Sequence, residues 1–295
     1  MDVDADVIAE RRHLLALGYR MLGTVAEAED AVQETYARWY RLTPSEREAI
    51  ASPRAWLTRV ASRVCLDVLG SARVRRESYV GPWLPEPVPS AAFGGLGAGT
   101  PDDPLDRVTL DDSVSSALLV VLEAMTPAER VAFILHDVFG LPFDEIAAVV
   151  GRSPAACRQL ATSARRRVAA GRERDVPREE HDRVVQAFGA AAAGGDLAAL
   201  VAVLDPDAVL TTDGGGRVSA ARRPVLGAEN VARFLLGLAD KYPESVVAPR
   251  QTADGLGFEV RQEGVVTGIL TFSVRAGRVA DIRMMRNPDK LTLWS

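Results

Sequence analysis

Cysteine, histidine and long apolar runs are scarce in this chain of 295 residues. The two cysteines, Cys65 and Cys157, lie far apart and form no CxxC pair, so neither a disulfide framework nor a zinc site is expected. With only three histidines, the sequence predicts no metal site and no cofactor. No apolar run approaches the ~18–20 residues of a membrane span, and the acidic Met1–Glu10 lacks the pattern of a signal peptide. We therefore expect a cytoplasmic protein without a membrane partner.

The charge is unevenly distributed along the chain. The net charge is −5, and 47% of the residues are hydrophobic, which is ordinary for a globular protein. Arginine greatly outnumbers lysine, and residues 54–76 hold six arginines against one acid, while residues 145–174 hold seven against two. Each window is therefore net +5, and localised basic stripes are typical of phosphate contact. The plain alternative is a solvated helix face.

Three capping patterns predict helices. Thr24-Val25-Ala26-Glu27 and Thr126-Pro127-Ala128-Glu129 read as capping boxes, and Ser52-Pro53 places a cap before a first-turn proline. Behind Ser52, the apolar residues recur at helical spacing and predict a buried stripe. A Pro/Gly-rich linker follows over residues 77–104; within it, Trp83–Pro87 is too apolar for an idle tether and is expected to dock on a neighbouring domain.

Residues 143–168 predict a helix-turn-helix. A short helix from Phe143 to Val150 is followed by Gly151 and by a second helix that starts at Ser153-Pro154. Cys157 belongs to the inward stripe of the second helix, and we interpret it as a small core residue. Arginine and glutamine pair with guanine and adenine edges, which makes DNA binding the favoured function. The outward positions are Ala155, Arg158, Gln159, Thr162, Arg165 and Arg166.

The C-terminal part changes from helices to strands. Residues 179–193, 197–204 and 228–241 predict helices, whereas residues 258–261, 265–274 and 279–285 predict strands, with a hairpin turn at Ala276-Gly277. Helices followed by an antiparallel sheet indicate an α+β domain.

Two stretches of the first part carry a family resemblance. Residues 28–36 (AEDAVQETY), then Pro53-Arg54-Ala55-Trp56-Leu57 and the basic helix behind them, resemble region two of bacterial sigma factors, and residues 143–168 resemble region four. The chain therefore resembles an extracytoplasmic-function (group IV) sigma factor over about residues 8–172. Three further segments are similar to signature motifs of the subgroup with a C-terminal SnoaL-like domain: Trp83-Leu84-Pro85-Glu86-Pro87, Asp213-Gly214-Gly215-Gly216-Arg217 and Asn287-Pro288-Asp289-Lys290-Leu291. Arg217 departs from the lysine that is usual there.

The resemblance implies a multidomain fold with two all-α domains and an α+β cone. Region two would cover residues 1–76, the linker 77–104, region four 105–172 and the SnoaL-like regulatory domain 179–291. Its partners would be core RNA polymerase, through the β and β′ subunits, and promoter DNA. A sigma factor makes no bond, so no catalytic residue is expected. The roles that the resemblance implies are polymerase binding by Glu27, Asp30, Gln33 and Glu34; −10 element binding by Arg54, Arg59, Arg63, Arg73, Arg75 and Arg76; and −35 element binding by the outward residues of the helix-turn-helix.

Three alternatives remain open from the sequence. An enzyme would need an acid/base pair in the cone, and Asp213, the best carboxylate there, has no obvious partner in the sequence. A ligand sensor would use the cone as an apolar pocket for a small molecule. A helix-turn-helix repressor would bind duplex DNA without polymerase. The residues that could line or fill the cone are Val209, Leu210, Phe234, Leu235, Phe258 and Phe272.

Overall fold

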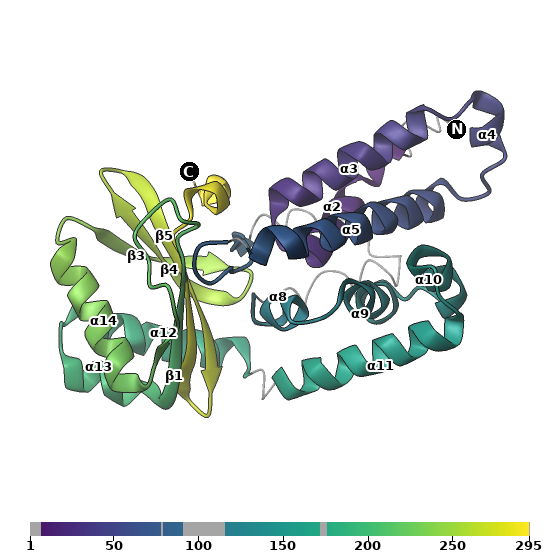
Figure 1. Ribbon diagram of the computed structural model, residues 1–295. Coiled ribbons are helices and arrows are strands. Elements are labelled where there is room, and N and C mark those ends of the chain that lie inside the picture. Colours follow the sequence, from purple (N-terminus) through teal and green to yellow (C-terminus); the bar gives the residue numbers. More distant parts are fainter. Residues whose placement is uncertain (1–6, 78, 91–115, 172–175, 295) are drawn as a thin grey trace. The chain divides into compact units, whose positions relative to one another are not determined.

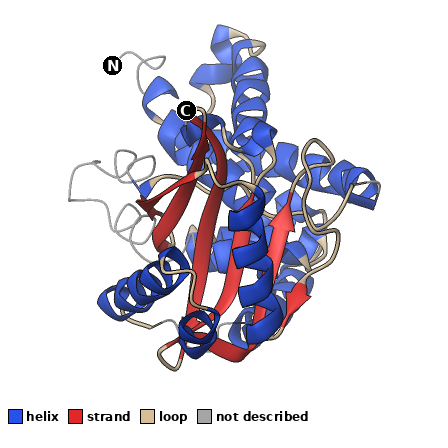
Figure 2. Ribbon diagram, turned by 90° about the vertical axis from the view of Figure 1, so that its left-hand side faces the viewer, coloured by secondary structure: helices blue, strands red, loops and turns tan. Residues whose placement is uncertain are grey.

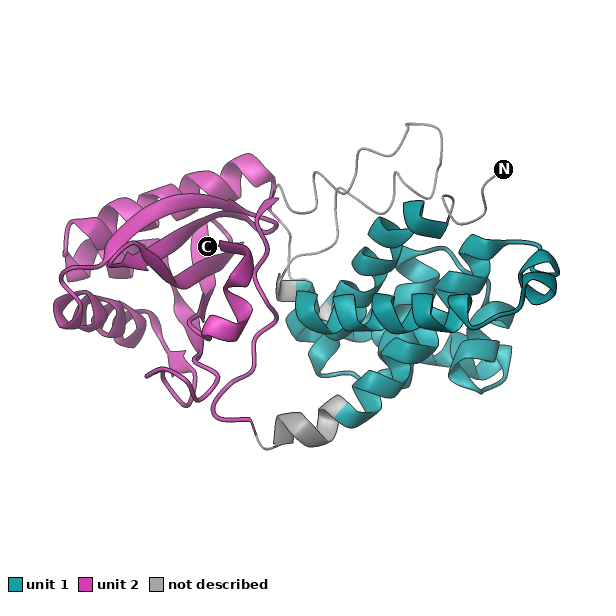
Figure 3. Ribbon diagram, turned by 90° about the horizontal axis from the view of Figure 1, so that it is seen from above, with its two compact units in different colours: residues 1–77, 95–114, 118–171 teal, residues 78–94, 115–117, 172–295 magenta. Residues whose placement is uncertain are grey.

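The computed structural model describes residues 7–77, 79–90, 116–171 and 176–294, apart from the side chains of residues 72–77, 116–117 and 170–171. These residues form two compact units, which are coloured separately in Figure 3. The helical unit holds the residues up to Glu77 together with Leu118–Gly171, and the sheet unit holds Tyr79–Ser90 together with Val176–Trp294. No helix of the described residues is long and apolar enough to cross a membrane.

The first half of the helical unit contains α2 (Arg11–Leu22), α3 (Val25–Tyr40), α4 (Pro44–Glu48) and α5 (Pro53–Glu77). The predicted N-caps are present: the Thr24 hydroxyl accepts from the Glu27 amide at the start of α3, and Ser52 accepts from the Ala55 amide at the start of α5. The Glu27 carboxylate accepts from the Thr24 hydroxyl. Helices α2, α3 and α5 pack against one another, and the indole of Trp39 is fully buried between them.

The second half of the unit contains α8 (Ser116–Glu123), α9 (Pro127–Phe133), a π-turn (Ile134–Val138), α10 (Phe143–Val150) and α11 (Pro154–Gly171). The capping box at Thr126 and Glu129 is formed as predicted. Gly151 adopts the left-handed conformation with φ of 70° and ends α10, which confirms the predicted turn of the helix-turn-helix. Helix α10 packs against both α11 and α5.

The sheet unit combines three helices with six strands (Figures 1 and 2). The helices are α12 (Arg178–Ala193), α13 (Leu197–Val203) and α14 (Ala228–Lys241). The sheet has the order β2-β1-β6-β5-β4-β3, and the helices cover one of its faces. The strands are β1 (Leu204–Asp213), β2 (Val225–Leu226), β3 (Val246–Thr252), β4 (Gly255–Gln262), β5 (Val265–Arg275) and β6 (Arg278–Met285).

The space between helices and sheet is filled by aromatic rings. Phe188 on α12 lies 5.0 Å from Phe272 and 6.5 Å from Phe258, measured between ring centroids. The ring of Phe258 also occupies the place that a side chain at Gly189 would need. Phe258, Phe272 and Leu210 therefore fill the interior of the cone, which was one of the two roles open from the sequence.

The observed sheet corrects the predicted one in two respects. Strands β1, β2 and β3 are absent from the sequence prediction, and β1 pairs in parallel with β6, so the sheet is mixed rather than antiparallel. Strand β1 starts at Leu204, where the predicted helix ends, and carries Asp205, Pro206 and Asp207, residues that disfavour strands. Strand β3 lies at the sheet edge, where Pro249 is tolerated.

Candidate functional site

The segment Tyr79–Ser90, here called the strap, lies on the sheet face opposite the helices. Strand pairing places Asp213 in register with Met285, whereas the preceding row of β1 and β6, Thr212 and Met284, points to the helix-covered core. Asp213 bonds to the strap at Tyr79 and Leu84, and Pro89 pairs with Thr252 at the end of β3. The strap therefore spans the sheet from β1 to β3.

The carboxylate of Asp213 is fully buried and accepts four hydrogen bonds. One oxygen accepts from the Tyr79 hydroxyl at 2.6 Å and from the Gly215 amide at 2.9 Å. The other accepts from the Leu84 amide at 2.9 Å and from the Lys290 ammonium at 2.8 Å. Asp213 thus does have partners, and they satisfy both of its oxygens, which leaves it no role as a general base.

The ammonium of Lys290 completes this cluster, which we call the clasp: Tyr79, Leu84, Asp213 and Lys290. Besides the Asp213 carboxylate, Lys290 donates to the Leu84 carbonyl at 2.6 Å. Its nitrogen lies 4.1 Å from the centroid of the Trp83 ring and 5.2 Å from that of Tyr79. A buried lysine is stable only when its charge is paired and its hydrogens are bonded. The strap supplies the Leu84 carbonyl and the rings of Trp83 and Tyr79, and β1 supplies the carboxylate of Asp213.

The pKa of the Tyr79 phenol is raised because the clasp is buried. Burial raises that pKa, and the hydrogen bond to the charged Asp213 raises it further, well above the usual range. The hydroxyl therefore stays protonated at every physiological pH and donates permanently to Asp213. Asn287, which belongs to the motif at residues 287–291, donates from Nδ2 to the same Tyr79 oxygen at 3.0 Å.

Backbone geometry explains the glycines of the second motif. Gly215 has a φ of 62°, and a Cβ on it would lie 2.4 Å from the side chain of Asn287. Gly216 has a φ of 71°, with Val80 of the strap beside it. Both positions need glycine because the loop turns through the left-handed region against the third motif and the strap. The glycines therefore allow a close approach of this loop's backbone to Asn287 and Val80.

Arg217 forms an ion pair with Asp289 at 3.2 Å between Nη2 and Oδ2. Their side chains are 64% and 60% exposed, so the contact is worth at most about 1 kcal/mol. The departure from lysine at this position falls on a solvent-exposed contact, outside the buried clasp.

The turn between β3 and β4 contacts both the strap and the start of α12. On the strap side, the Ala253 amide donates to the Val88 carbonyl at 3.0 Å. On the α12 side, Arg178 donates to Gln251 at 2.8 Å, and Asp182 accepts from the Leu256 amide at 2.8 Å. The strap and α12 therefore meet this turn at neighbouring points of the sheet unit.

Within the helical unit, the two halves are joined by buried arginines. Arg130 on α9 donates to the carbonyl of Met21 on α2 at 2.8 Å and to the carbonyl of Leu122 at 2.7 Å. Arg20 on α2 lies over the ring of Phe139, with its guanidinium carbon 5.6 Å from the centroid. Burial lowers the pKa of both arginines to about 10, so both remain charged.

The residues predicted to bind polymerase lie along α3. Asp30 and Gln33 are exposed, whereas Glu34 is half-buried and pairs with Arg38 at 2.8 Å. Glu27 is half-buried and accepts from the Thr24 hydroxyl at 2.9 Å, which ties its carboxylate to the helix cap. The three outer residues thus share a face with open access, and Glu27 has a local structural role as well.

The residues predicted to contact the −10 element lie along α5. Arg59 and Arg63 are exposed, and Arg54 pairs with Glu10 at 3.5 Å. Trp56 packs edge-on against Trp39 at 5.3 Å between centroids. The side chains of three further predicted residues lie outside the described part of the chain: Arg73, Arg75 and Arg76.

The outward face of α11 is open along its length. All six residues predicted to contact the −35 element are exposed. Arg158 stacks over the ring of Phe143 at 5.1 Å, and Arg165 donates to Asp137 at 2.6 Å. Cys157 is fully buried, as expected of a core residue. Among the described residues, no group of histidine, cysteine and acidic side chains is arranged to hold a metal ion.

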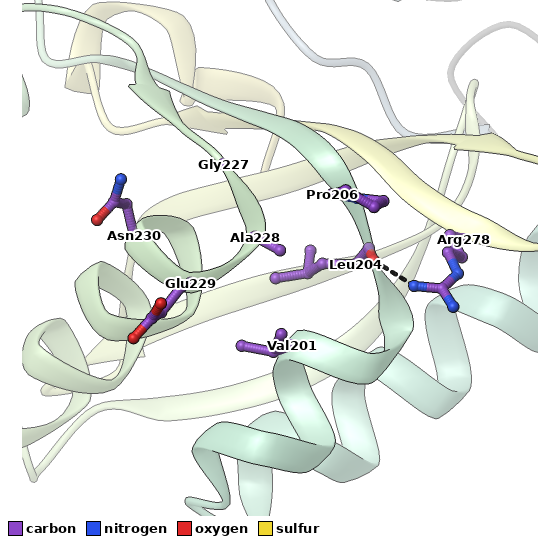
Figure 4. A pocket seen from close by; sticks show the side chains of 8 residues that line it. All are labelled: Val201, Leu204, Pro206, Gly227, Ala228, Glu229, Asn230 and Arg278. Carbon is purple, nitrogen blue, oxygen red and sulfur yellow. Dashed lines mark hydrogen bonds between the residues drawn. The ribbon is translucent and has the colours of Figure 1, made fainter.

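A pocket of about 360 Å³ opens between α13, β1 and the start of α14 (Figure 4). Its lining includes Val201, Pro206, Glu229 and Arg278, and none of the six residues proposed for a sensor cavity borders it. At the start of α12, burial alone would raise the pKa of Asp182, but bonds from the Leu256 amide, His181 and Gln251 lower it. These bonds give Asp182 a structural role in place of a catalytic one.

Two protein-family models match the two halves of the helical unit. The family model for Sigma-70 region 2 matches residues 7–76, and that for Sigma-70, region 4 matches residues 115–168. The chain is 43% identical over 296 residues to the ECF RNA polymerase sigma factor SigJ of Mycobacterium tuberculosis, covering 96% of this chain and 91% of that protein. The chain belongs to the ECF RNA polymerase sigma factors. Sigma factors are not enzymes, which removes the catalytic alternative.

One further relative and one crystal structure also match over nearly the whole chain. SigI of the same organism is 36% identical over 285 residues, covering 96% of this chain and 92% of that protein. The crystal structure of the SigJ protein matches with a TM-score of 0.73 at 39% identity, covering 99% of this chain and 98% of that one. The sheet unit of this sigma factor is the helix-and-sheet cone that the SnoaL-like resemblance implies.

Sequence reasoning missed two residues of the strap site. Tyr79 lies just before the first motif, and Trp294, whose indole donates to the Pro87 carbonyl at 2.9 Å, lies just after the third. An aromatic residue beside each motif was the available signal, because buried Tyr and Trp polar atoms are usually bonded.

Proposed function

We propose that this cytoplasmic sigma factor directs core RNA polymerase to promoters through four parts: residues 1–76, 77–104, 105–172 and 179–291. The face of α3 with Asp30, Gln33 and Glu34 contacts the β′ subunit, and the linker follows the polymerase channel beside β. Helix α5 opens the −10 element, and α11 enters the major groove at the −35 element. The exposure of Arg59, Arg63 and the outer α11 residues supports these roles.

The sheet unit tunes this activity in cis through the clasp. When the strap is bound to the sheet, the first half of the linker between the two helical halves is held there, and Arg130 holds those halves together. A sigma factor must place its two DNA-binding parts on separate promoter elements. The linker raises the effective concentration of the second part at its element only when it can span the distance between the two elements. Release of the strap therefore favours the promoter-bound form.

The single observation that supports this proposal is the buried Asp213–Lys290 ion pair closed over the backbone of Leu84. It joins three motifs that lie far apart in sequence, and the first of these motifs belongs to the linker. A structural ion pair alone would not require a proline-rich linker to complete it.

Run-off transcription with purified core polymerase tests the proposal. We expect output to change when the chain is shortened after residue 173, or after Arg286, and in Asp213→Asn, because each removes part of the clasp. The matched control is Asp289→Asn, which neutralises an exposed carboxylate in the same region. Unchanged output in both truncations and in Asp213→Asn would contradict regulation in cis, and absence of transcription with full-length chain and all variants would contradict the sigma-factor assignment of the site residues.

A further inference from the structure

The strap and the sheet unit are complementary in hydrogen-bonding groups. Four prolines in the strap lack an N–H, so this segment is rich in acceptors and poor in donors. The sheet unit presents three donors to backbone carbonyls of the strap: Lys290 to the Leu84 carbonyl at 2.6 Å, the Trp294 indole to the Pro87 carbonyl at 2.9 Å, and the Ala253 amide to the Val88 carbonyl at 3.0 Å. The prolines are Pro82, Pro85, Pro87 and Pro89.

The same face also recognises the strap's side chains. Residues 84–88 are all buried, with Leu84 4%, Glu86 2% and Val88 2% exposed, whereas Val80 is 52% exposed. The ring of Trp83 lies against the Lys290 ammonium. Donors for carbonyls, an aromatic contact and pockets for selected side chains are the means by which proline-rich ligands are bound elsewhere.

These contacts are local to residues 83–88 and do not depend on chain connectivity. We propose that this face of the sheet unit is a peptide-binding site, with the strap as its built-in ligand, and that it accepts in trans an extended segment of another protein. That segment carries an aromatic residue, then leucine, proline, an acid, proline and an aliphatic residue. This inference rests on the proposed regulation in cis, because the partner acts by displacing the strap.

Tethering sets the strength that such a partner needs. A segment held on a short linker competes at an effective concentration on the order of millimolar. A trans segment displaces the strap only when it binds with better contacts or when the strap is weakened. The site is therefore closed by default and opens to a specific competitor.

Lysine reactivity provides a direct measure of occupancy. The chain contains two lysines, the buried Lys290 and the exposed Lys241, which serves as an internal control. Full-length wild type and Leu84→Ser are treated with an amine-acetylating reagent, and labelling at both lysines is followed by mass spectrometry. We expect Lys290 to react at least tenfold more slowly than Lys241 in wild type and at a similar rate in Leu84→Ser.

The probe is the peptide YVGPWLPEPVPS, which copies residues 79–90, with blocked termini. Added to Leu84→Ser, it restores at least tenfold protection of Lys290 and leaves Lys241 unchanged, whereas a scrambled peptide restores none. Trp83→Ser serves as the second weakened variant if Leu84→Ser does not fold. No protection by millimolar peptide, or equal protection by the scrambled sequence, overturns the proposal. A dimer that forms only with intact Leu84 would assign the site to a second copy and also overturn it.

Run-off transcription with the truncated chains distinguishes failure of the peptide-binding inference from failure of the proposed regulation in cis. If the truncations alter promoter output but the peptide does not protect Lys290, regulation in cis stands and the trans ligand is wrong. If the peptide protects Lys290 but neither truncation changes output, the site binds peptide as inferred, and the proposal of regulation in cis fails.

Discussion

Arg130 donates a 2.8 Å hydrogen bond to the backbone carbonyl of Met21, across 109 positions of the sequence. The two residues belong to different promoter-binding regions of the chain, so this bond measures whether those regions are packed together. Burial of the Arg130 guanidinium is nearly complete, and its remaining hydrogens bond to the Leu122 carbonyl and to Glu123.

Replacing Arg130 should loosen the helical unit. We expect Arg130→Met to lower the free energy of unfolding by about 3 kcal/mol or more, because several charge-assisted bonds are lost and Glu123 is left without its cation. Urea denaturation followed by far-UV circular dichroism measures the change. Arg158→Met, on the exposed face of α11, should change stability by less than about 0.5 kcal/mol. Equal effects of the two variants would contradict the role given to Arg130.

The clasp can be tested by the coupling between its charges. Breaking a buried ion pair from one side costs about 3–5 kcal/mol, so Asp213→Asn and Lys290→Met should each destabilise the sheet unit strongly. The double variant should cost much less than the sum, because each single change leaves an unpaired buried charge. Thermal unfolding of the four proteins gives the coupling energy.

The exposed pair Arg217–Asp289 is the matched control for this cycle. Its coupling should not exceed about 1 kcal/mol, since both side chains are more than half exposed. Coupling of equal size in the two cycles would show that burial of Asp213 and Lys290 contributes nothing.

The elements with local signals could be predicted, and those fixed by tertiary contacts could not. The caps at Thr126 and Ser52, the turn at Gly151 and helix α14 were predicted because capping residues, glycine and apolar spacing act within a few positions. Strand β1 was not, because its partner β6 lies some seventy residues away and its own Asp205-Pro206-Asp207 favours a turn.

The clasp shows the same limit at the level of the site. The three motifs were found from the sequence, but their meeting at one carboxylate was not, because no local pattern relates Asp213 to Lys290 or to the Leu84 backbone. Among its neighbours in sequence Asp213 has no charged partner, whereas the fold brings the strap residues Tyr79 and Leu84 and the distant Lys290 to its carboxylate.

Acid should destabilise the helical unit through Glu129. Burial alone would raise the pKa of this carboxyl, but bonds from the Thr126 backbone and hydroxyl and from Ser163 lower it below its ordinary value. A lowered folded-state pKa adds stability that is fully present above the unfolded-state pKa, which is about 4.3, and is lost as the pH falls through the folded value.

We therefore expect the stability difference between wild type and Glu129→Gln to be largest near neutral pH and to shrink below pH ~4.5. Urea midpoints measured between pH 3 and pH 7 test this. Asp144→Asn, which neutralises an exposed carboxylate on α10, should leave the pH dependence of the wild type unchanged. A difference that stays constant across the range would show that Glu129 is not stabilised as an anion.

The outer face of α11 should separate base reading from phosphate contact. Arg158 and Gln159 lie in the first half of the helix, whereas Arg165 and Arg166 lie toward its C-terminal end, and all four are exposed. Base contacts carry sequence information and phosphate contacts do not.

With the polymerase holoenzyme, Arg158→Ala should cost about 1–3 kcal/mol of discrimination between the cognate −35 element and a single-base variant of it. Arg166→Ala should instead weaken both sequences equally and lower the salt dependence of binding by about one phosphate contact. Fluorescence anisotropy on both sequences at several salt concentrations measures both effects. Equal loss on both sequences in Arg158→Ala, with a reduced salt dependence, would show that this side chain contacts the backbone and that another residue of α11 reads the bases.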